Sequence, residues 1–429
     1  MACASAAALF YSVVSIYRHD RFASDAYDLG IFDQTIWGYS HLEIVRNTVK
    51  GVPNLLGDHF HPALMAVAPA YWIWNDARVL LVVQALLLAA ASLPIFWWAR
   101  SRLGLVGAVG IQLAFLAFWG VLAGAIFDFH ELALAVPAIS FGLYALLERR
   151  ARLFWSMFVL GCLSKEDVAL TFAAMGVYAA LVQRRGRFGL GVVALAGAWF
   201  AVTISTIVPA IAGRRYHYWD YPSLGPRWTS APLALARRPW RVLATPFDNR
   251  TKLETLAATF GAWLFLPLFS PLLLVAIPTV AERFLAGNPS FWTAKFQYSL
   301  PIAPILAFAA IDSLTRLRGA RVRGLGLAGV LACGLVLSLA VIRPLQGLSE
   351  YMPEARAAAI DSCLDRIPPQ AAVAASGSLV PHLTHRLRID PIFRQKHDRY
   401  LAVDGRAARA AGYRRVCRRG GVTVLRARA

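Results

Sequence analysis

Long apolar runs recur along most of this chain and constrain its fold more than any other feature. The clearest of them cover residues 77–99, 105–127, 188–211, 300–314 and 325–342. Helices of a soluble protein carry a polar face, which these runs largely lack. A stretch of about 20 apolar residues is long enough to cross a bilayer as a helix. The runs therefore predict an all-α polytopic membrane protein, against the alternative of a large soluble core.

Charged residues are scarce and unevenly placed. They make up 16% of the chain, against about 25% in soluble domains. The formal net charge of +20 invites a nucleic-acid-binding interpretation, but much of it lies in short clusters beside apolar runs, at residues 100–102, 148–152, 184–187 and 316–323. Such clusters mark the cytoplasmic ends of membrane helices. No zinc-finger spacing or RNA-binding aromatic signature accompanies them, so the sequence predicts no nucleic-acid partner.

Placing every basic cluster in the cytoplasm gives a multi-pass topology of about eleven spans, with the N-terminus cytoplasmic and the C-terminus extracytoplasmic. Residues 2–17 form a short first span, and the sequence leaves open whether the natural chain starts further upstream. Residues 153–163 and 168–182 form a hairpin of two short helices with Lys165-Glu166-Asp167 at its tip. A hairpin is favoured because three charges are costly at the bilayer centre.

In this topology the non-basic polar residues emerge together on the extracytoplasmic side, in segments 25–62, 128–131, 165–167, 213–252 and 282–298. The first extracytoplasmic loop, residues 18–62, is dense in carboxylates, histidines and aromatic residues. Its residues 26–39 are patterned as a helix, for which Asp25 is a suitable N-cap. The convergence predicts a functional cavity on the outer face.

The last part of the chain changes to a polar, arginine-rich composition. We expect a transmembrane domain over residues 1–348 and a small α/β extracytoplasmic domain over residues 349–429, rather than a loosely ordered tail. The expected elements are a helix at 355–367, a short helix at 379–384 and strands at 371–375, 400–403 and 422–425. Cys363 and Cys417 pair if this domain lies in an oxidising compartment, or else remain separate thiols.

Two aspartates of the first loop, Asp28 and Asp33, are the leading catalytic candidates. A carboxylate beside a hydroxyl can take its proton during a reaction. On a helix over residues 26–39 the two side chains point in different directions, so they need not act as a pair. At least one of them is expected to be catalytic, and the sequence leaves the choice open.

Two short histidine–carboxylate motifs allow two interpretations. The side chains are those of Asp58, His59, His61, Asp128, His130 and Glu131. They could hold a divalent metal ion, because imidazoles and carboxylates are common ligands of zinc-like or manganese-like ions. They could equally form a hydrogen-bonded polar network, because histidine acts as donor and acceptor. Both interpretations place the six side chains around one cavity, and no cofactor is certain.

Cations in two segments could contact a phosphate. Lys165 could bind one while Glu166 and Asp167 orient it, or the three could form a neutralised ion triplet at the hairpin tip. Arg214 and Arg215 precede several aromatic residues, a mixture that suits a lipid phosphate headgroup, although an interfacial aromatic belt explains the aromatics equally well. No P-loop, dinucleotide-binding glycine pattern or nucleophile elbow appears, so a nucleotide-driven pump or a hydrolase has little support.

Five motifs in order resemble a family of uncharacterised prokaryotic multi-spanning membrane proteins, itself similar to the GT-C glycosyltransferase superfamily. They are Asp28-Leu-Gly-Ile-Phe-Asp33-Gln34, Gly57-Asp-His-Phe-His-Pro62, Phe127-Asp-Phe-His-Glu131, Lys165-Glu-Asp167 and Leu379-Val-Pro-His-Leu383. The resemblance to the family covers nearly the whole chain. The step to GT-C rests on architecture and on the acidic first loop.

The resemblance implies a membrane enzyme that transfers a sugar from a polyprenyl-phosphate donor to an acceptor at the outer membrane face. The base would be Asp28 or Asp33, and a second amphipathic helix would cover residues 42–52. The adjacent acid pair of many GT-C loops is absent, because Leu29 follows Asp28. The expected substrate-binding residues are Gln34, Lys165, Glu166, Asp167, Arg214 and Arg215. The expected partners are a lipid-linked sugar donor and membrane lipids.

Two other functions stay open. In a secondary transporter, Lys165, Glu166 and Asp167 would form an ion path at the membrane midplane. In a non-catalytic assembly factor for envelope polysaccharides, the C-terminal domain would bind a partner. The sequence does not name the sugar, the acceptor, any metal or the oligomeric state.

Overall fold

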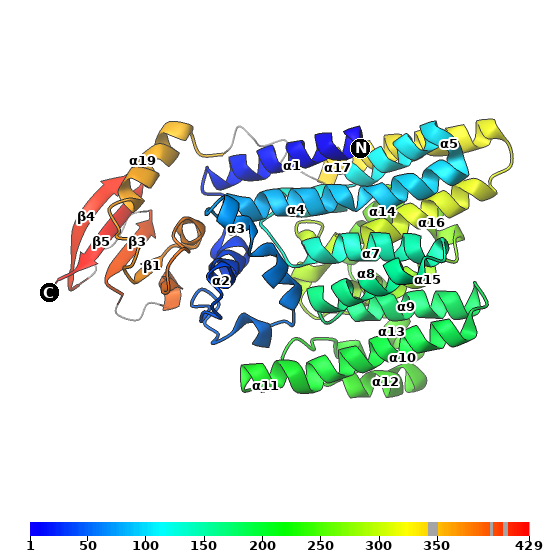
Figure 1. The fold of residues 1–429 in the computed structure, drawn as a ribbon, viewed down its shortest axis with the longest axis horizontal. Helices are drawn as coiled ribbons and strands as arrows, with labels where there is room; N and C mark the ends of the chain where they lie inside the picture. Colours follow the sequence, from blue (N-terminus) through cyan, green and yellow to red (C-terminus); the bar gives the residue numbers. More distant parts are fainter. Residues whose placement is uncertain (342–350, 395–397, 406–410, 429) are drawn as a thin grey trace.

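A long helical bundle carries a small mixed α/β unit at one end (Figure 1). The computed structural model describes residues 1–341, 351–394, 398–405 and 411–428. The expected boundary between residues 348 and 349 lies outside this part of the chain. Most bundle helices run along the long axis of the molecule (Figure 1), as expected for helices that share one membrane.

The helices of residues 1–341 follow the expected apolar runs with small shifts of their ends, except that the run at 105–127 is divided between two helices and that two short helices at 231–237 and 239–244 were not expected. Their bounds are α1 (Ala2–His19), α2 (Ile31–Ser40), α3 (Ala70–Ile73), α4 (Arg78–Ala90), α5 (Ser92–Leu116), α6 (Trp119–Ile126), α7 (Leu132–Leu147), α8 (Ala151–Ser164), α9 (Val168–Leu181), α10 (Gly186–Val202), α11 (Val208–Ala212), α12 (Ala231–Arg237), α13 (Pro239–Ala244), α14 (Arg250–Gly261), α15 (Leu273–Phe284), α16 (Ile302–Arg316) and α17 (Ala320–Val341). The helix α16 is buried along most of its length. It packs against α5, α7 and α15 at the centre of the bundle.

Four helical stretches among the described residues are long and apolar enough to cross a membrane. They are Arg78–Leu116, Gly186–Ala212, Gln297–Arg316 and Ala320–Val341. The first contains a sharp bend at Gly104, where φ is 74° and ψ is −174°, a conformation that glycine adopts at little cost. Shorter apolar helices, including α7, α8 and α9, lie beside them. The count of about eleven spans stays a prediction, because it includes such short helices.

Three of the basic clusters lie at one end of the bundle. The bend inside α5, the turn between α9 and α10 and the turn between α16 and α17 all lie at the end opposite to the sheet (Figure 1). These turns carry residues 100–102, 184–187 and 316–323. By the positive-inside rule this end of the bundle would face the cytoplasm, and the outward orientation of the C-terminal unit stays a prediction.

The C-terminal unit packs the helix α19 (Glu354–Leu364) against a five-stranded sheet of order β2-β1-β3-β5-β4. The bounds are β1 (Val373–Ala375), β2 (Ile389–Pro391), β3 (Tyr400–Asp404), β4 (Tyr413–Arg419) and β5 (Val422–Ala427). β1 pairs in parallel with β2 and β3, whereas β5 pairs antiparallel with β3 and β4. The sequence did not predict β2, which is three residues long, or β4, which is mostly exposed and arginine-rich.

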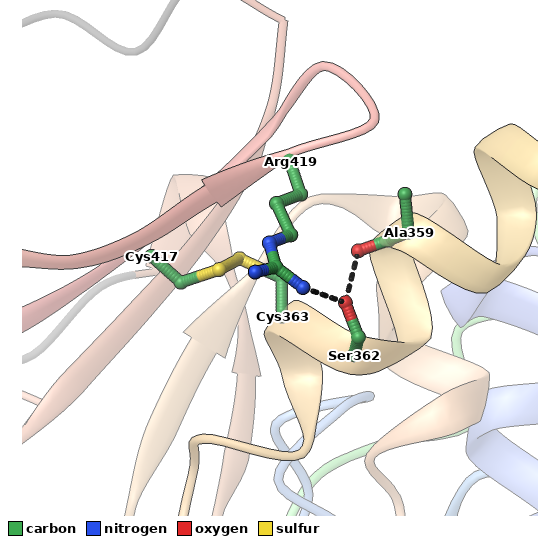
Figure 2. The surroundings of a disulfide bond; sticks show 5 residues. All are labelled: Ala359, Ser362, Cys363, Cys417 and Arg419. Carbon is green, nitrogen blue, oxygen red and sulfur yellow. Dashed lines mark hydrogen bonds between the residues drawn. A yellow bond between two sulfur atoms is a disulfide. The ribbon is translucent and has the colours of Figure 1, made fainter.

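A disulfide joins Cys363 of α19 to Cys417 of β4, which answers the alternative that the sequence left open (Figure 2). Beside it, Arg419 donates a hydrogen bond to Ser362, whose hydroxyl donates to the carbonyl of Ala359 (Figure 2). The bridge closes a loop that contains three of the five strands, so it restricts the unfolded chain and stabilises the unit.

The first loop and the C-terminal unit share one apolar core. Leu29 and Ile36 from the loop belong to the same buried cluster as Leu379 and Val380 from the unit. The packing is close, because a Cβ built on Gly30 would lie 3.0 Å from the side chain of Val380. Burial of this shared surface fixes the loop against the unit and therefore fixes the loop's polar side chains.

Of the two helices expected in the first loop, the first forms and the second does not. The helix predicted over residues 26–39 forms as a π-helical turn, Ala26–Gly30, followed by α2, and Asp25 caps it by accepting a hydrogen bond from the N–H of Tyr27. Residues 42–52 form no helix. Leu42 and Ile44 are exposed there, and Asn47 instead donates hydrogen bonds to Ile31 and Thr35. Without an apolar face to bury, a short helix has little to stabilise it.

Candidate functional site

The five polar segments meet at one cavity of about 610 Å³. Each segment contributes at least one charged or aromatic side chain to its lining: Asp28, His130, Lys165, Tyr218 and Glu282. The expectation of a shared cavity is confirmed. The hairpin of α8 and α9 places Lys165 between the two helices, as predicted.

A histidine links two carboxylates in the cavity wall. The Nε2 atom of His130 lies 2.8 Å from Oδ1 of Asp28, and its Nδ1 atom lies 2.9 Å from Oε2 of Glu131. Asp28 stands in the first turn of the loop helix, whereas His130 and Glu131 immediately precede α7. Two segments distant in the sequence therefore orient one carboxylate. The Asp28 side chain keeps 23% of its surface exposed, so a ligand in the cavity can reach it.

The charge state of His130 follows from its two partners. Burial alone would lower the pKa of His130, but Glu131 and Asp28 raise it to about 9. The imidazole is therefore protonated at neutral pH and donates a hydrogen bond from each nitrogen. Glu131, which His130 and Lys165 face, has its pKa held well below the usual range despite its burial. The row Asp28–His130–Glu131 thus carries two negative charges and one positive charge.

A second buried carboxylate ties three segments together. Glu166 accepts hydrogen bonds from the Nδ1 atom of His59 at 2.7 Å, the N–H of Phe60 at 2.9 Å and the hydroxyl of Tyr216 at 2.8 Å. Burial would raise the pKa of Glu166, but the charge and hydrogen bond of His59, the charge of Lys165 and a backbone hydrogen bond lower it to about 2. Glu166 itself does not line the cavity, so its position is behind the wall that His59 forms.

Replacing Glu166 with glutamine is expected to lower the free energy of unfolding by about 2 kcal/mol, because an amide cannot accept all three bonds with a full charge. Thermal unfolding of the purified protein in detergent measures the loss. Glu148→Gln is the matched control, because Glu148 is exposed and its ion pair with Arg102 is as long as 4.0 Å. Equal melting temperatures for the two variants would contradict this role of Glu166.

The two ammonium groups of the cavity differ in their surroundings. Lys165 lies 3.0 Å from Asp167 and 3.8 Å from both Glu131 and Glu282, and only 9% of its side chain is exposed. Lys50 has one carboxylate partner, Asp58, at 3.3 Å, and 25% of its side chain is exposed. Three carboxyl groups surround Lys165, whereas Lys50 has a single ion-pair partner among the described residues, so Lys50 is the cation more available to an anionic ligand.

Several expected site residues lie outside this cavity. Asp33 is fully buried and faces Tyr71, Thr384 and His385. Gln34 bonds to Thr48 and to the carbonyl of Arg386. Both side chains therefore hold the loop to the C-terminal unit.

Some of the other expected residues also lie outside the cavity, and the rest line it. Asp128 is buried and accepts a hydrogen bond from the N–H of Asp25. Arg214 lines an adjoining hollow, and Arg215 is exposed and lines none of the described cavities. Asp58, His59 and His61 line the cavity with His130 and Glu131, as expected.

The structure favours the hydrogen-bonded interpretation of the two histidine motifs. Among the described residues, no three His, Cys, Asp or Glu side chains come together as a metal-binding group. The carboxylates instead pair with neighbouring donors, as Asp58 does with the hydroxyl of Tyr218 at 2.6 Å. His61 is buried, and burial lowers its pKa to about 4, so its imidazole is neutral.

Four residues outside the sequence motifs also belong to the site. Lys50 and Glu282 line the cavity with Gln297 and Tyr298. The amide of Gln297 lies 2.8 Å from Nε2 of His130. A lone glutamine or tyrosine in a loop carries no motif, so only its position identifies it. Glu282 gave a weak signal, as a carboxylate at the end of an apolar run.

The fold and the cavity together define a class: a polytopic helical protein with an acidic, histidine-containing cavity beside its first loop. A family model described as "Predicted membrane protein (DUF2079)" matches residues 18–404, and the chain belongs to this family. No curated protein matches the chain in sequence.

Two crystal structures of ArnT from Cupriavidus metallidurans share the fold. The structure bound to undecaprenyl phosphate has a TM-score of 0.60 and 14% sequence identity, and covers 99% of this chain and 97% of that chain. The apo structure has a TM-score of 0.57 at the same identity and covers 99% and 98%. ArnT is a GT-C glycosyltransferase. The GT-C-like fold implied by the sequence resemblance is therefore confirmed.

Proposed function

We propose that this protein is a membrane glycosyltransferase that moves a sugar from a polyprenyl-phosphate donor to an acceptor hydroxyl at the extracytoplasmic face. The observation that carries the proposal is the position of Asp28, an accessible carboxylate held by His130 in the cavity where all five polar segments meet. The shared fold with a protein bound to undecaprenyl phosphate supports a lipid-linked donor.

The reaction needs a base, a leaving group and a fixed geometry. Asp28 takes the proton of the acceptor hydroxyl as its oxygen attacks the anomeric carbon of the donor sugar. A new carbon–oxygen bond forms, the bond from that carbon to the phosphate oxygen breaks, and the polyprenyl phosphate leaves as an anion. His130 is a positioning residue, because it holds Asp28 by one oxygen and is itself held by Glu131.

The leaving phosphate needs a cation. The expected contact, Lys165, is enclosed by three carboxylates, and we assign it to orienting them. Lys50 is more exposed and has a single carboxylate partner, so we assign the phosphate contact to Lys50. Asp58 then holds the Lys50 ammonium between turnovers.

The proposal is tested with the full-length protein in liposomes and a panel of polyprenyl-phosphate-linked sugars that carry a labelled sugar. Release of free polyprenyl phosphate together with transfer of the label to an added envelope extract is the expected result. If no donor of the panel is bound or consumed by folded protein, the proposed function is wrong.

The pH dependence of the transfer rate is expected to reflect the protonation state of His130. Its imidazolium is present below its pKa of about 9, so the wild-type rate should fall as the pH rises through about 9. In His130→Gln this alkaline fall should disappear, and the rate at neutral pH should be about tenfold lower because Asp28 is less well oriented. Rate profiles between pH 6 and pH 10 measure both effects, and an unchanged alkaline limb in the variant would exclude this role.

A further inference from the structure

Two further hollows continue the cavity toward the C-terminal unit. The middle one, of about 560 Å³, shares Tyr27, Lys50, His217 and Tyr218 with the cavity. The outer one, of about 460 Å³, shares Gly51 and Arg394 with the middle one. The three hollows therefore adjoin one another, and the outer one lies at the side of the C-terminal unit. We call the outer and middle hollows together the cationic groove.

The cationic groove carries an excess of positive charge, whereas the cavity carries charges of both signs. Its lining carries the cations Arg46, Lys50, Arg214, Arg388 and Arg394, and one carboxylate, Asp390. The inner cavity mixes both signs of charge: Lys50, Lys165 and the protonated His130 share its lining with the carboxyl groups of Asp28, Asp58, Glu131, Asp167, Asp220 and Glu282. A cleft lined by one sign of charge attracts ligands of the other sign. The gradient favours a ligand whose charged part stays in the groove while a neutral part enters the cavity.

Two of these arginines are available to a ligand. Within the part of the chain that the structure describes, neither Arg46 nor Arg214 makes a hydrogen bond or an ion pair, and both are exposed. Each guanidinium presents a planar set of donors that matches a carboxylate or a phosphate. Surface arginines are common, but here they line a concave groove that leads to Asp28.

Both parts of the protein build the groove. Arg388 and Arg394 come from the C-terminal unit, whereas Arg46 and Lys50 come from the first loop. Arg394 donates a hydrogen bond to the carbonyl of Val49. It lies so close to Gly51 that a Cβ there would collide with its guanidinium. Docking of the C-terminal unit therefore completes the groove.

Aromatic rings beside the cations indicate a sugar-containing ligand rather than a simple anion. Tyr27, which adjoins Asp28, stacks on Phe393 with ring centroids 6.0 Å apart. The two residues are 38% and 68% exposed, so part of each ring is accessible to a ligand. A flat, apolar ring face beside charged donors suits a sugar ring that carries an acidic group.

We propose that the cationic groove binds an anionic acceptor, an oligosaccharide with carboxylate or phosphate groups, and directs one of its hydroxyls toward Asp28. This inference rests on the proposed function, because it assigns the acceptor to the same cavity. The acceptor's negative charges lie against Arg46, Arg388 and Arg394, which assigns the C-terminal unit to substrate selection.

The test measures binding without requiring sugar transfer. The full-length protein in nanodiscs of zwitterionic lipid is titrated into dye-labelled tetragalacturonate or dye-labelled maltotetraose, its neutral counterpart, and fluorescence anisotropy is followed. We expect salt-sensitive binding of the acidic probe only. The double variant Arg46→Gln/Arg394→Gln should weaken that binding at least about tenfold. Arg46→Gln alone should weaken it in the same direction, and its exposed position makes misfolding of this variant no concern.

The control removes the same amount of charge, in this case from the C-terminal unit alone. Arg415→Gln/Arg418→Gln changes two exposed arginines of β4 that line none of the hollows, and it should leave binding unchanged. Equal binding of both probes, an unaffected double variant or an equal loss in the control would each overturn the proposal. Competition by inorganic phosphate at matched ionic strength would identify a simple anion site and would overturn it as well.

A further variant separates this inference from the proposed function. Asp28→Asn should still bind tetragalacturonate, because Asp28 does not line the cationic groove. Binding without any transfer by the wild type would leave the groove valid and reject the glycosyltransferase. Sugar transfer without binding of the acidic probe would support the glycosyltransferase and reject the anionic acceptor in the groove.

Discussion

Asp28→Asn is expected to abolish sugar transfer while the protein remains folded. An amide cannot accept the proton of the acceptor hydroxyl, and loss of a positioned base lowers a rate by about 10²–10⁴-fold. The substitution preserves the shape of the side chain and its contact with His130, which lies 2.8 Å away. The expected result is therefore a loss of rate with an unchanged melting temperature, measured on the same liposome preparations.

The matched control for Asp28→Asn is Glu43→Gln. Glu43 lies in the same loop, is exposed and lines none of the described cavities, so its charge should not matter for transfer. Wild-type rates in Asp28→Asn would show that another group accepts the proton. Equal losses in both variants would point to the net charge of the loop instead of a base.

Asp33→Ala is expected to destabilise the protein strongly, by about 3–5 kcal/mol, because it removes the acceptor of a buried charged network. Asp33 is fully buried, and it accepts hydrogen bonds from the hydroxyls of Tyr71 and Thr384. The Nε2 atom of His385 lies 3.2 Å from its second oxygen. Without the carboxylate these donors face an apolar core, and the contact between α2 and the C-terminal unit weakens.

Two measurements check the Asp33 prediction. The melting temperature should fall, and hydrogen exchange should increase in residues 379–389, which contact the first loop. Asp404→Ala is the control, because Asp404 is an exposed carboxylate of the C-terminal unit. If Asp33→Ala melts like the wild type but transfers no sugar, Asp33 is the base and the assignment to Asp28 is wrong.

The free energy of unfolding should depend on pH through the ion pair of Asp33 and His385. Burial alone would raise the pKa of Asp33 and lower that of His385, but their mutual attraction holds the first below 3.8 and the second above 6.5. The Asp33 contribution is present above pH 3.8 and is lost as the pH falls through its lowered pKa. The His385 contribution is complete below pH 6.5 and is lost as the pH rises through its raised pKa. Docking of the C-terminal unit should therefore weaken in alkaline solution, and His385→Gln should remove that dependence.

The choice between Asp28 and Asp33 shows where sequence reasoning ends. Five residues along a helix turn a side chain by about 140° relative to the first one, so the sequence indicates that the two aspartates face different surroundings. It does not indicate which face meets the cavity. The C-terminal unit decides this, because its residues Thr384 and His385 occupy the side of Asp33.

The same limit applies to the histidine motifs and to Lys165. Each motif offered two functions because the chemistry of a side chain depends on its partners. Glu166 binds His59, and Lys165 binds three carboxylates. His59 and Glu166 lie 107 residues apart in the sequence, so no local pattern could identify them as partners.

The sequence by itself determined the helical architecture, the hairpin of α8 and α9, the most prominent strands of the C-terminal unit and the set of polar segments that meet at the cavity. Hydrophobic burial and charge placement act through local composition, so a single chain displays them. The tertiary structure alone decided that Asp28 faces the cavity, that Asp33 and Gln34 fasten the C-terminal unit and that Lys50 and Gln297 belong to the site. Those roles arise from contacts between distant segments, and packing creates such contacts only when the whole chain has folded.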